Sequence, residues 1–346
     1  MPHERLKSKL HHYGIRGDTL NWIAAFLHNR RQRVLLNGAS SEWSDVISGV
    51  PQGTVSGPLL FLLYINDITE GIKSNIRLFA DDCVLYKTIS SPSDSAILQD
   101  DLNRLVNWSD KWQMSFNVKK CYMMHLSRKK KASPLQLYSM KGTPMTVVTS
   151  HPYLGVEIRS DLRWDEHVNK ISRNASRTLG MVRRNLSGCC KSTKSLAYIS
   201  LVRPQIEYAS SVWDPYTLKH INQLEMIQRR GARFVNADYR YSSSPSMMLE
   251  KLKWQSLEVR RKMARLSMFF KASQGNFAIS LNKLQKPVRQ SRSSEPHTYI
   301  QIGAHSDAYK FSFFPRTVVD WNMLPYSVVE RQSVDSFRSA LVNYYM

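Results

Sequence analysis

The chain is poor in cysteine and in acidic side chains, and it contains no long apolar run. Its four cysteines are Cys83, Cys121, Cys189 and Cys190, and no two are spaced as Cys-x-x-Cys. Neither a zinc knuckle nor a disulfide framework is therefore predicted, and we expect reduced thiols in an intracellular protein. The ten histidines form no His-x-x-x-His pattern that would indicate metal ligands. No stretch of eighteen apolar residues is present, so neither membrane spanning nor secretion is expected.

The shortage of acidic residues leaves a strongly basic chain. Its 346 residues include 49 Lys and Arg against 27 Asp and Glu, a formal net charge of +22 with a pI near 9.9, which points to a polyanionic partner. The charge is uneven: residues 48–100 carry a net of −3 and residues 163–270 a net of +12. A basic surface beside an acidic pocket suits a protein that grips a phosphate backbone and performs metal chemistry next to it. A merely solvated basic surface is the alternative.

The acidic region contains two adjacent aspartates inside an apolar stretch. The flanking residues 78–80 and 83–86 are mostly strand formers, so Asp81 and Asp82 are predicted at the tip of a tight β-hairpin. Neighbouring side chains on a strand point to opposite faces, whereas at a turn both can converge on one point. Carboxylate oxygens held in this way suit Mg²⁺. For an isolated Asp-Asp pair, a solvated turn is the alternative.

A loop rich in glycine and proline lies upstream of the hairpin. Residues 49–58 contain three glycines and two prolines, so the backbone can pass close to a ligand. Ser56 or Gly57 is expected to cap the following helix, with Pro58 in its first turn. That helix is strongly apolar, and we expect it to be buried beneath the hairpin. Without the hairpin, the segment would read as an ordinary loop entering a core helix.

The loop and the hairpin together resemble motifs B and C of reverse transcriptases. The Phe-Ala-Asp-Asp form of residues 79–82 is similar to the non-LTR (LINE-type, jockey-like) retrotransposon branch. Three more segments follow in the family's order: Asn117 to Lys120 is similar to the Asn-x-x-Lys of motif D, residues 153–158 to motif E, the primer grip, and residues 313–325 to a tail segment of jockey-like elements. The resemblance extends over nearly the whole chain and is most specific before about residue 160.

The resemblance implies an RNA-directed DNA polymerase that uses two Mg²⁺ ions to add deoxynucleoside triphosphates to a DNA primer on an RNA template. It implies that Asp81 and Asp82 are catalytic metal ligands, and that Lys120 neutralises or protonates the leaving pyrophosphate. An exposed lysine beside Lys119 is the alternative for Lys120, and a plain buried strand is the alternative for the primer grip. The residues implied in substrate binding are Gln52, Gly53, Phe79, Tyr153, Leu154 and Gly155.

One expected part of the family's metal site is not found. Relatives supply a further aspartate from motif A, which ends in a segment similar to Ala-Phe-Asp-x-Val-Pro-His-x-x-Leu. The chain starts with Met1-Pro2-His3, similar to the end of that segment, and no acidic residue precedes Glu4. We therefore expect a C-terminal fragment without fingers and motif A. A non-catalytic nucleic-acid-binding remnant stays open as an alternative, and the sequence neither supports nor excludes a maturase-like RNA chaperone.

The predicted fold class is α+β. Residues 1–160 are expected to form a partial right-hand palm, in which an antiparallel sheet has helices packed behind it. Two helices are predicted within residues 3–29, a hairpin within 32–47, a long helix at 97–112, and strands near 119–126 and 153–158. The basic run at 128–131 is expected to be a solvated loop.

A helical, thumb-like basic region is predicted for residues 161–273. Apolar residues recur at three- and four-residue steps along 165–186, and further helices fit 193–201, 218–234 and 257–270. Residues 274–310 are a predicted linker, and 311–346 a C-terminal segment of unknown role that ends in a helix near 334–344. By the resemblance, the protein would act in the nucleus and cytoplasm.

A primer-extension assay tests the expectation about the metal site. Residues 1–346, given an RNA template, a DNA primer, all four deoxynucleoside triphosphates and Mg²⁺, should yield little product, because two adjacent carboxylates bind Mg²⁺ weakly. The Asp81→Ala/Asp82→Ala double variant gives the background of the assay. Robust synthesis that disappears in this variant would show that the expectation is wrong.

Overall fold

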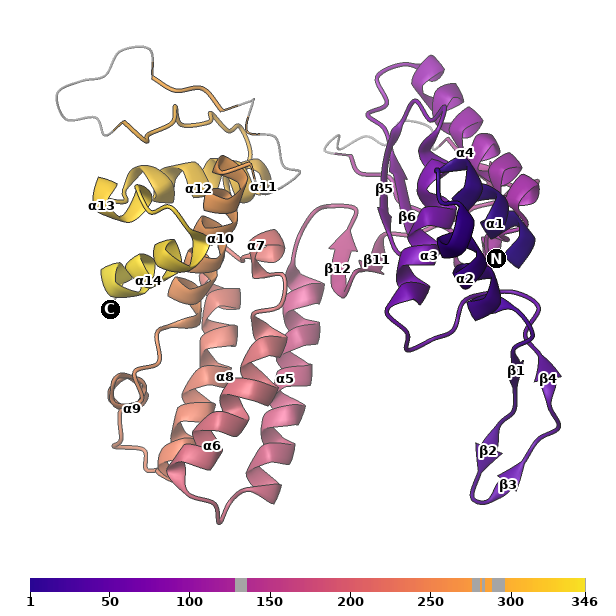
Figure 1. Ribbon diagram of the computed structural model, residues 1–346. Helices are drawn as coiled ribbons and strands as arrows, with labels where there is room; N and C mark the ends of the chain where they lie inside the picture. Colours follow the sequence, from indigo (N-terminus) through magenta and orange to yellow (C-terminus); the bar gives the residue numbers. More distant parts are fainter. Residues whose placement is uncertain (128–135, 276–280, 282–283, 288–295, 346) are drawn as a thin grey trace. The chain divides into compact units, whose positions relative to one another are not determined.

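The structure is a computed structural model that describes residues 1–127, 136–275, 281, 284–287 and 296–345 (Figure 1). Helices alternate with short strands, in agreement with the predicted α+β class. The chain divides into two compact units, Met1–Val148 and Thr149–Met346. None of the described helices is both long enough and apolar enough to span a membrane. The predicted basic loop at 128–131 and much of the predicted linker at 274–310 lie outside the described residues.

The first unit begins with two helices that share one core with a third. Helices α1 (His3–His12) and α2 (Gly17–Leu27) agree with the prediction for residues 3–29. Their buried side chains pack with α3 (Ser56–Ile65) in a core formed by Leu6, Leu10, Ile23, Leu27, Leu60, Tyr64 and Ile65.

Helix α3 is not buried in the way that we predicted. Its buried side chains face α1, α2 and α4 (Pro92–Trp112), and no residue of the aspartate hairpin belongs to this core. On its other side, Leu59 and Leu62 are 58% and 50% exposed. Because α3 is apolar on nearly all sides, its sequence predicts burial but does not indicate which side of the helix is buried or which elements cover it.

The aspartate hairpin consists of β5 (Asn75–Phe79) and β6 (Asp82–Tyr86), paired antiparallel. Helix α4 follows it and contains the predicted helix at 97–112. This helix begins earlier than expected, at a capping box between Ser91 and Asp94. The carboxylate of Asp101 in α4 accepts the backbone N–H groups of Lys73 at 3.0 Å and Ser74 at 2.7 Å. The start of β5 is thereby fixed to α4.

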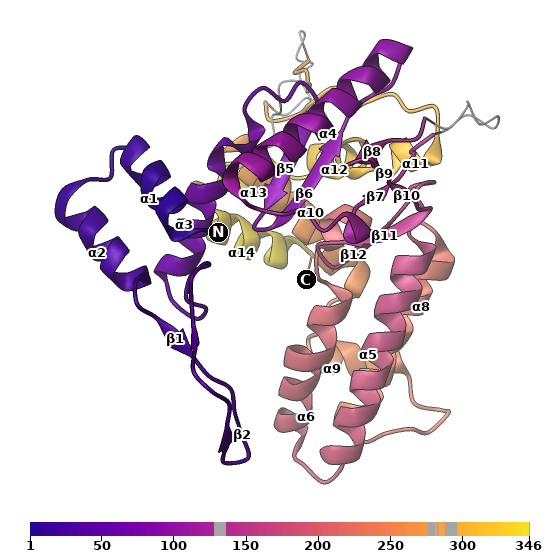
Figure 2. The same ribbon diagram turned by 90° about the vertical axis from the view of Figure 1, so that its right-hand side faces the viewer.

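The remaining strands of the first unit are short. The hairpin predicted within residues 32–47 is present as two exposed antiparallel ladders, which extend away from the helices (Figure 2). We predicted a single sheet, and this prediction is wrong: among the described residues, each sheet consists of only two strands. The strand bounds in this unit are β1 (Arg31–Gln32), β2 (Leu35–Leu36), β3 (Ala39–Ser40), β4 (Ser44–Asp45), β7 (Tyr122–Met123), β8 (Ser139–Met140), β9 (Thr143–Pro144) and β10 (Thr146–Val147).

A buried lysine holds the helices of the first unit together. Lys9 of α1 is 3% exposed, and its ammonium contacts the Asp67 carboxylate and the Tyr64 carbonyl, both at 2.5 Å. It also lies over the aromatic rings of Trp108 and Trp112, with 4.7 and 3.9 Å to their centroids. Trp108 donates its indole N–H to the same Asp67 oxygen at 3.0 Å. This Lys9 cluster therefore links α1, α3 and α4.

The second unit starts with the hairpin of β11 (Ser150–Tyr153) and β12 (Val156–Arg159) and is otherwise helical. The helices predicted from the apolar spacing are present, and Val168, Ala175, Leu179 and Val182 form the buried stripe of the first of them. The helix bounds are α5 (Asp165–Asn185), α6 (Lys191–Ala197), a π-helical turn (Tyr198–Val202), α7 (Ser210–Trp213), α8 (Leu218–Asn236), α9 (Pro245–Lys251) and α10 (Leu257–Ser273).

The C-terminal segment packs onto α10 rather than standing apart from it. Leu266, Phe269 and Phe270 of α10 share a second core with Trp321 and Phe337 of this segment. Beside that core, Asp214 pairs with Arg261 at 2.8 Å and with Arg265 and Arg316, and Asp320 pairs with Arg265 and Lys262. The segment contains α11 (Asp307–Lys310), α12 (Phe313–Asn322), α13 (Tyr326–Val329) and α14 (Val334–Tyr345).

Replacing Lys9 tests the importance of its cluster. Lys9→Ala removes the partner of Asp67 and the cation over two tryptophans, and we expect a loss of about 3–5 kcal/mol in the free energy of unfolding of the first unit. Urea unfolding followed by tryptophan fluorescence measures this loss. Lys7→Ala, on the same helix but paired only with exposed Glu4, should change stability by less than about 0.5 kcal/mol. Equal losses in both variants would contradict a special role for Lys9.

Candidate functional site

A two-residue turn carries the two aspartates. Phe79 pairs with Asp82, so the turn consists of Ala80 and Asp81 alone, as predicted for a tight hairpin. Ala80 has φ +49°, the left-handed conformation that two-residue hairpin turns require. Asp81 is therefore in the turn and Asp82 opens strand β6, and both side chains are exposed. Phe79, at the end of β5, is 61% exposed.

The strand beyond Asp82 faces the predicted motif D segment. Burial raises the pKa of the Cys83 thiol to about 11, and Cys121 adds to the shift. Because side chains alternate along a strand, Asp82 lies on the opposite face from Cys83 and stays in solvent. Lys120 directly precedes Cys121 and ends a 3₁₀ turn, in which its backbone N–H donates to the Asn117 carbonyl at 2.9 Å. The side chain of Lys120 is exposed.

The loop before α3 is held by the hydroxyl of Thr54, which no sequence pattern indicates. Thr54 donates to the Pro51 carbonyl at 2.8 Å and accepts the Gly57 N–H at 3.1 Å. The expected cap at Ser56 or Gly57 is therefore wrong, because Thr54 satisfies the first turn of the helix. A Cβ at Gly57 would lie 2.8 Å from the Pro51 carbonyl oxygen, so this position requires glycine.

The tip of this loop contains the predicted substrate-binding pair. Gln52 and Gly53 are exposed in a turn, where Gly53 has φ +77°. The base of the loop is joined to the start of the chain: His3 Nε2 lies 2.9 Å from the Gly49 carbonyl, and the Gly49 N–H donates to the Met1 carbonyl at 2.8 Å. The first unit thus holds Gln52, Gly53, the aspartates and Lys120 on the surface of one compact body.

The two aspartates offer the oxygen ligands that Mg²⁺ prefers, but two carboxylates are too few to hold the ion by themselves. In the part of the chain that the structure describes, no cluster of three or more His, Cys, Asp or Glu side chains is placed to hold a metal ion. If Mg²⁺ binds here, Asp81 and Asp82 would supply two of its oxygen ligands, and the others would have to come from elsewhere. The described residues do not enclose an ion by themselves.

The predicted primer grip forms the turn of a hairpin in the second unit. Tyr153 ends β11, and Leu154 and Gly155 form a two-residue turn with φ +46° and +79°. Tyr208 donates its hydroxyl to the Leu154 carbonyl at 3.1 Å, and a Cβ at Gly155 would come within 3.2 Å of the Tyr208 ring. Gly155 is exposed, while Tyr153 and Leu154 are half-buried, so this segment is not a plain buried strand.

Polar contacts fix this hairpin to α5. Glu157 accepts hydrogen bonds from the Ser150 hydroxyl at 2.7 Å and from the Lys170 ammonium at 3.0 Å. His167 is 1% exposed, and its Nδ1 accepts the Glu157 N–H at 3.2 Å. Burial lowers the pKa of His167 to about 4, with a further contribution from Lys170. Neither Tyr208 nor His167 has a sequence signal of its own, because their partners lie on other elements.

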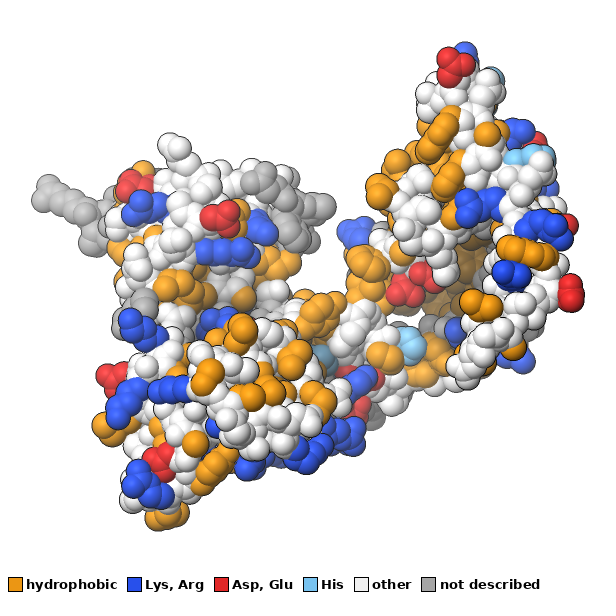
Figure 3. Space-filling model, turned by 60° about the horizontal axis from the view of Figure 1, so that its bottom comes forward, with side chains coloured by type: hydrophobic (Ala, Val, Ile, Leu, Met, Phe, Trp, Pro, Cys, Tyr) orange, Lys and Arg blue, Asp and Glu red, His pale blue; other side chains and the backbone are white. Residues whose placement is uncertain are grey.

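The second unit has a strongly basic surface. Along α5, the arginines at 173, 177, 183 and 184 lie off the buried stripe and are exposed. Figure 3 shows Lys and Arg side chains gathered along one edge of this unit. Such a surface can contact successive phosphates of a nucleic-acid backbone without reading bases.

Comparison with known proteins identifies relatives of both parts of the chain. Residues 1–158 match the family described as "Reverse transcriptase (RNA-dependent DNA polymerase)". The chain is 26% identical over 280 residues to a probable RNA-directed DNA polymerase from transposon X-element of Drosophila melanogaster, an alignment that covers 78% of this chain and 31% of that protein. It is also 26% identical over 230 residues to the RNA-directed DNA polymerase from mobile element jockey of the same species, covering 62% and 24%. The chain thus spans about a quarter to a third of the length of these relatives.

The buried histidine predicts a pH dependence of stability. His167 titrates near 6.5 when unfolded and near 4 when folded, so the unfolded state binds the extra proton between these values. Stability should therefore fall with decreasing pH in this window, by at most about 1.4 kcal/mol per pH unit from this residue. His167→Gln should flatten that part of the curve in urea unfolding from pH 7 to 4. His12→Gln, at an exposed position, should keep the wild-type slope, and equal slopes in all three proteins would contradict the assignment.

Proposed function

We propose that the chain is a reverse transcriptase of the non-LTR retrotransposon type, like the family and the relatives that it matches, and that it takes part in copying RNA into DNA. Its substrates would be an RNA template, a DNA primer and deoxynucleoside triphosphates. The observation that carries the proposal is the two-residue turn that exposes Asp81 and Asp82, preceded by the Gly53 loop and followed by Lys120. The nucleus and the cytoplasm are the proposed sites of action.

Five residues of the first unit have a proposed role in this reaction. Asp81, free of the β-ladder in the turn, would bind metal most directly, and Asp82 would add the supporting carboxylate. Bound Mg²⁺ would supply the positive charge that stabilises the attacking and leaving oxygens. Lys120 would place a further positive charge, or a proton, at the leaving pyrophosphate. Gln52 and Gly53 would approach the incoming nucleotide, because their turn exposes both a side-chain amide and bare backbone.

The two units have complementary proposed roles. The first would be part of a polymerase palm. The second would be a thumb that holds the RNA–DNA duplex by its phosphates, with Tyr153 to Gly155 against the primer end. The exposed Arg173 and Arg177 on α5 support this role, because an A-like duplex is recognised mainly through shape and backbone. Tyr208 would position the primer-grip turn through the Leu154 carbonyl.

A second candidate function is nucleic-acid binding without synthesis. The lack of a metal-holding cluster of three or more His, Cys, Asp or Glu side chains among the described residues favours it. The two functions differ in their dependence on the aspartates, because phosphate binding by the second unit requires no metal.

Fluorescence anisotropy with a labelled RNA template annealed to a DNA primer tests the proposed nucleic-acid binding. The logarithm of the affinity should fall linearly with the logarithm of the salt concentration, and Arg173→Gln/Arg177→Gln should reduce this slope by about 1–2, because each lost phosphate contact accounts for roughly 0.9.

The same assay distinguishes the roles of the two units. Asp81→Asn/Asp82→Asn should leave the affinity unchanged while abolishing any synthesis that the wild type supports. Asp18→Asn, an exposed aspartate of α2, serves as the control for removing one carboxylate. Failure of the wild type to bind the template–primer, or an unchanged slope in the arginine variant, would overturn the proposed thumb.

A further inference from the structure

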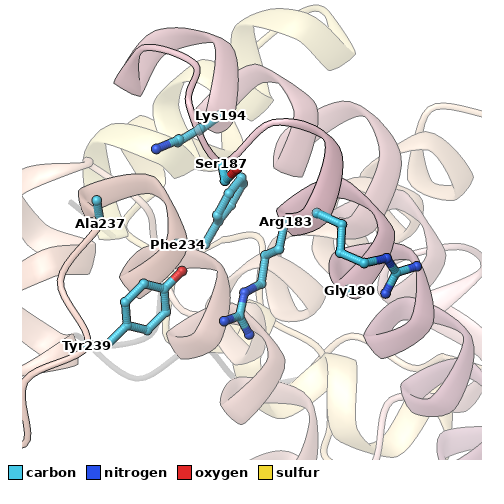
Figure 4. Close-up of a pocket in the computed structure, with 8 residues that line it drawn as sticks. Gly180, Arg183, Ser187, Lys194, Phe234, Ala237 and Tyr239 are labelled. Atoms are coloured by element: carbon cyan, nitrogen blue, oxygen red, sulfur yellow. The ribbon is translucent and has the colours of Figure 1, made fainter.

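The second unit contains a pocket away from the primer-grip hairpin. It has a volume of about 490 Å³ and lies between the end of α5, the start of α6 and the end of α8 (Figure 4). This size is typical of a site for a small ligand or for one unit of a larger ligand. The pocket is lined by Gly180, Arg183, Arg184, Ser187, Lys194, Phe234, Ala237 and Tyr239.

The charges of this pocket are all positive and are not neutralised by the protein. Arg183, Arg184 and Lys194 line it, no lining residue is acidic, and none of the ion pairs found among the described residues involves these three cations. Lys194 is 7% exposed, and its ammonium lies 5.6 Å from the centroid of the Phe234 ring. Three cations that line one pocket without a carboxylate create a positive potential there, and an anionic ligand would neutralise it.

The acidic residue between Ala237 and Tyr239 makes its contacts within its own loop. Asp238 accepts hydrogen bonds from the guanidinium of Arg240 and, at 2.6 Å, from the hydroxyl of Ser243, which hold the pKa of its carboxyl well below its usual range. Arg233 of α8 donates to the carbonyls of Arg240 and Ser243 at 2.9 and 3.1 Å. These contacts fix the loop and hold Tyr239 at the mouth of the pocket.

An aromatic surface lies next to the cations. The Tyr239 side chain is 52% exposed, and the Arg183 guanidinium carbon lies 5.1 Å from the centroid of its ring. Figure 4 shows Tyr239 and Arg183 on neighbouring walls, with Phe234 above them. Exposed aromatic rings beside arginines are the combination that binds an unpaired base by stacking while contacting its phosphates. In a duplex the base faces are covered by their neighbours, so a duplex cannot use the ring in this way.

We propose that this pocket binds single-stranded nucleic acid. An unpaired base stacks on Tyr239, and Arg183, Arg184 and Lys194 contact the adjoining phosphates. That the ligand is a nucleic acid rests on the proposed function. The pocket adds a site for the unpaired strand, separate from the surface proposed to hold the duplex.

Two labelled probes test the proposal by fluorescence anisotropy: a twelve-nucleotide oligoadenylate, and a blunt RNA–DNA duplex of twelve base pairs. Tyr239→Ala should weaken binding of the single strand by about 5- to 100-fold, the usual effect of losing one stacked base, and should leave duplex binding unchanged. Tyr239→Phe should retain the wild-type affinity, because the ring is preserved. Tyr241→Ala is the matched control, since this tyrosine is fully exposed and does not line the pocket.

The charges are tested in the same assay. Arg184→Gln should reduce the salt slope for the single strand by about 0.7, whereas Lys251→Gln, at an exposed position on α9, should leave it unchanged. Thermal unfolding confirms that each variant is folded. Equal effects of Tyr239→Ala and Tyr241→Ala, or equal weakening of both probes by Tyr239→Ala, would overturn the proposal. If the wild-type protein binds the duplex but not the single strand, the proposed role of the pocket is wrong and the proposed function stands. If it binds neither probe, the proposed function is wrong.

Discussion

The candidate active site depends on one geometric constraint of the β-strand. Two adjacent side chains on a strand point to opposite faces, so adjacent carboxylates can act together only where the strand ends. The chain satisfies this constraint with a turn of two residues, in which Ala80 takes a left-handed conformation that glycine or asparagine usually provides. Asp81 then lies in the turn and Asp82 at the first ladder position. A turn longer by one residue would change the face on which Asp82 lies.

The position of this turn is determined by helices that do not touch the aspartates. Asp101 of α4 accepts the N–H groups that precede β5, and α4 is joined to α1 and α3 through the buried ammonium of Lys9. Helix α3 in turn begins at the Gln52–Gly53 loop, where Thr54 closes the turn. A change at Lys9 should therefore reach the loop and the hairpin together, because both are attached to the same set of helices.

Much of this arrangement was predictable from the sequence, for definite reasons. The hairpin followed from strand formers on both sides of Asp81–Asp82, and the helices of the second unit followed from apolar spacing along 165–186 and beyond. The predicted single sheet was wrong, because hydrophobic pattern identifies strands but not their pairing partners. The direction in which α3 is buried and the roles of His167 and Tyr208 depend on contacts between different elements, which no local pattern marks. The Thr54 cap is a local contact with Gly57, but Ser56 is an equally suitable cap by residue type. The basic pocket combines α5, α6 and the loop after α8, so no local motif marks it.

The proposed role of Asp81 and Asp82 is to bind the metal ion of a polymerase site. Fe²⁺ can replace Mg²⁺ on carboxylate oxygens, and with ascorbate and peroxide it cleaves the polypeptide backbone close to where it is bound. The most direct test maps these cuts in the protein bound to template–primer and a deoxynucleoside triphosphate. We expect a principal cut within a few residues of the Ala80–Asp81 turn, which disappears in Asp81→Asn/Asp82→Asn and persists in Asp18→Asn. Cuts only at other places, or a cut at the turn that survives the double substitution, would contradict it.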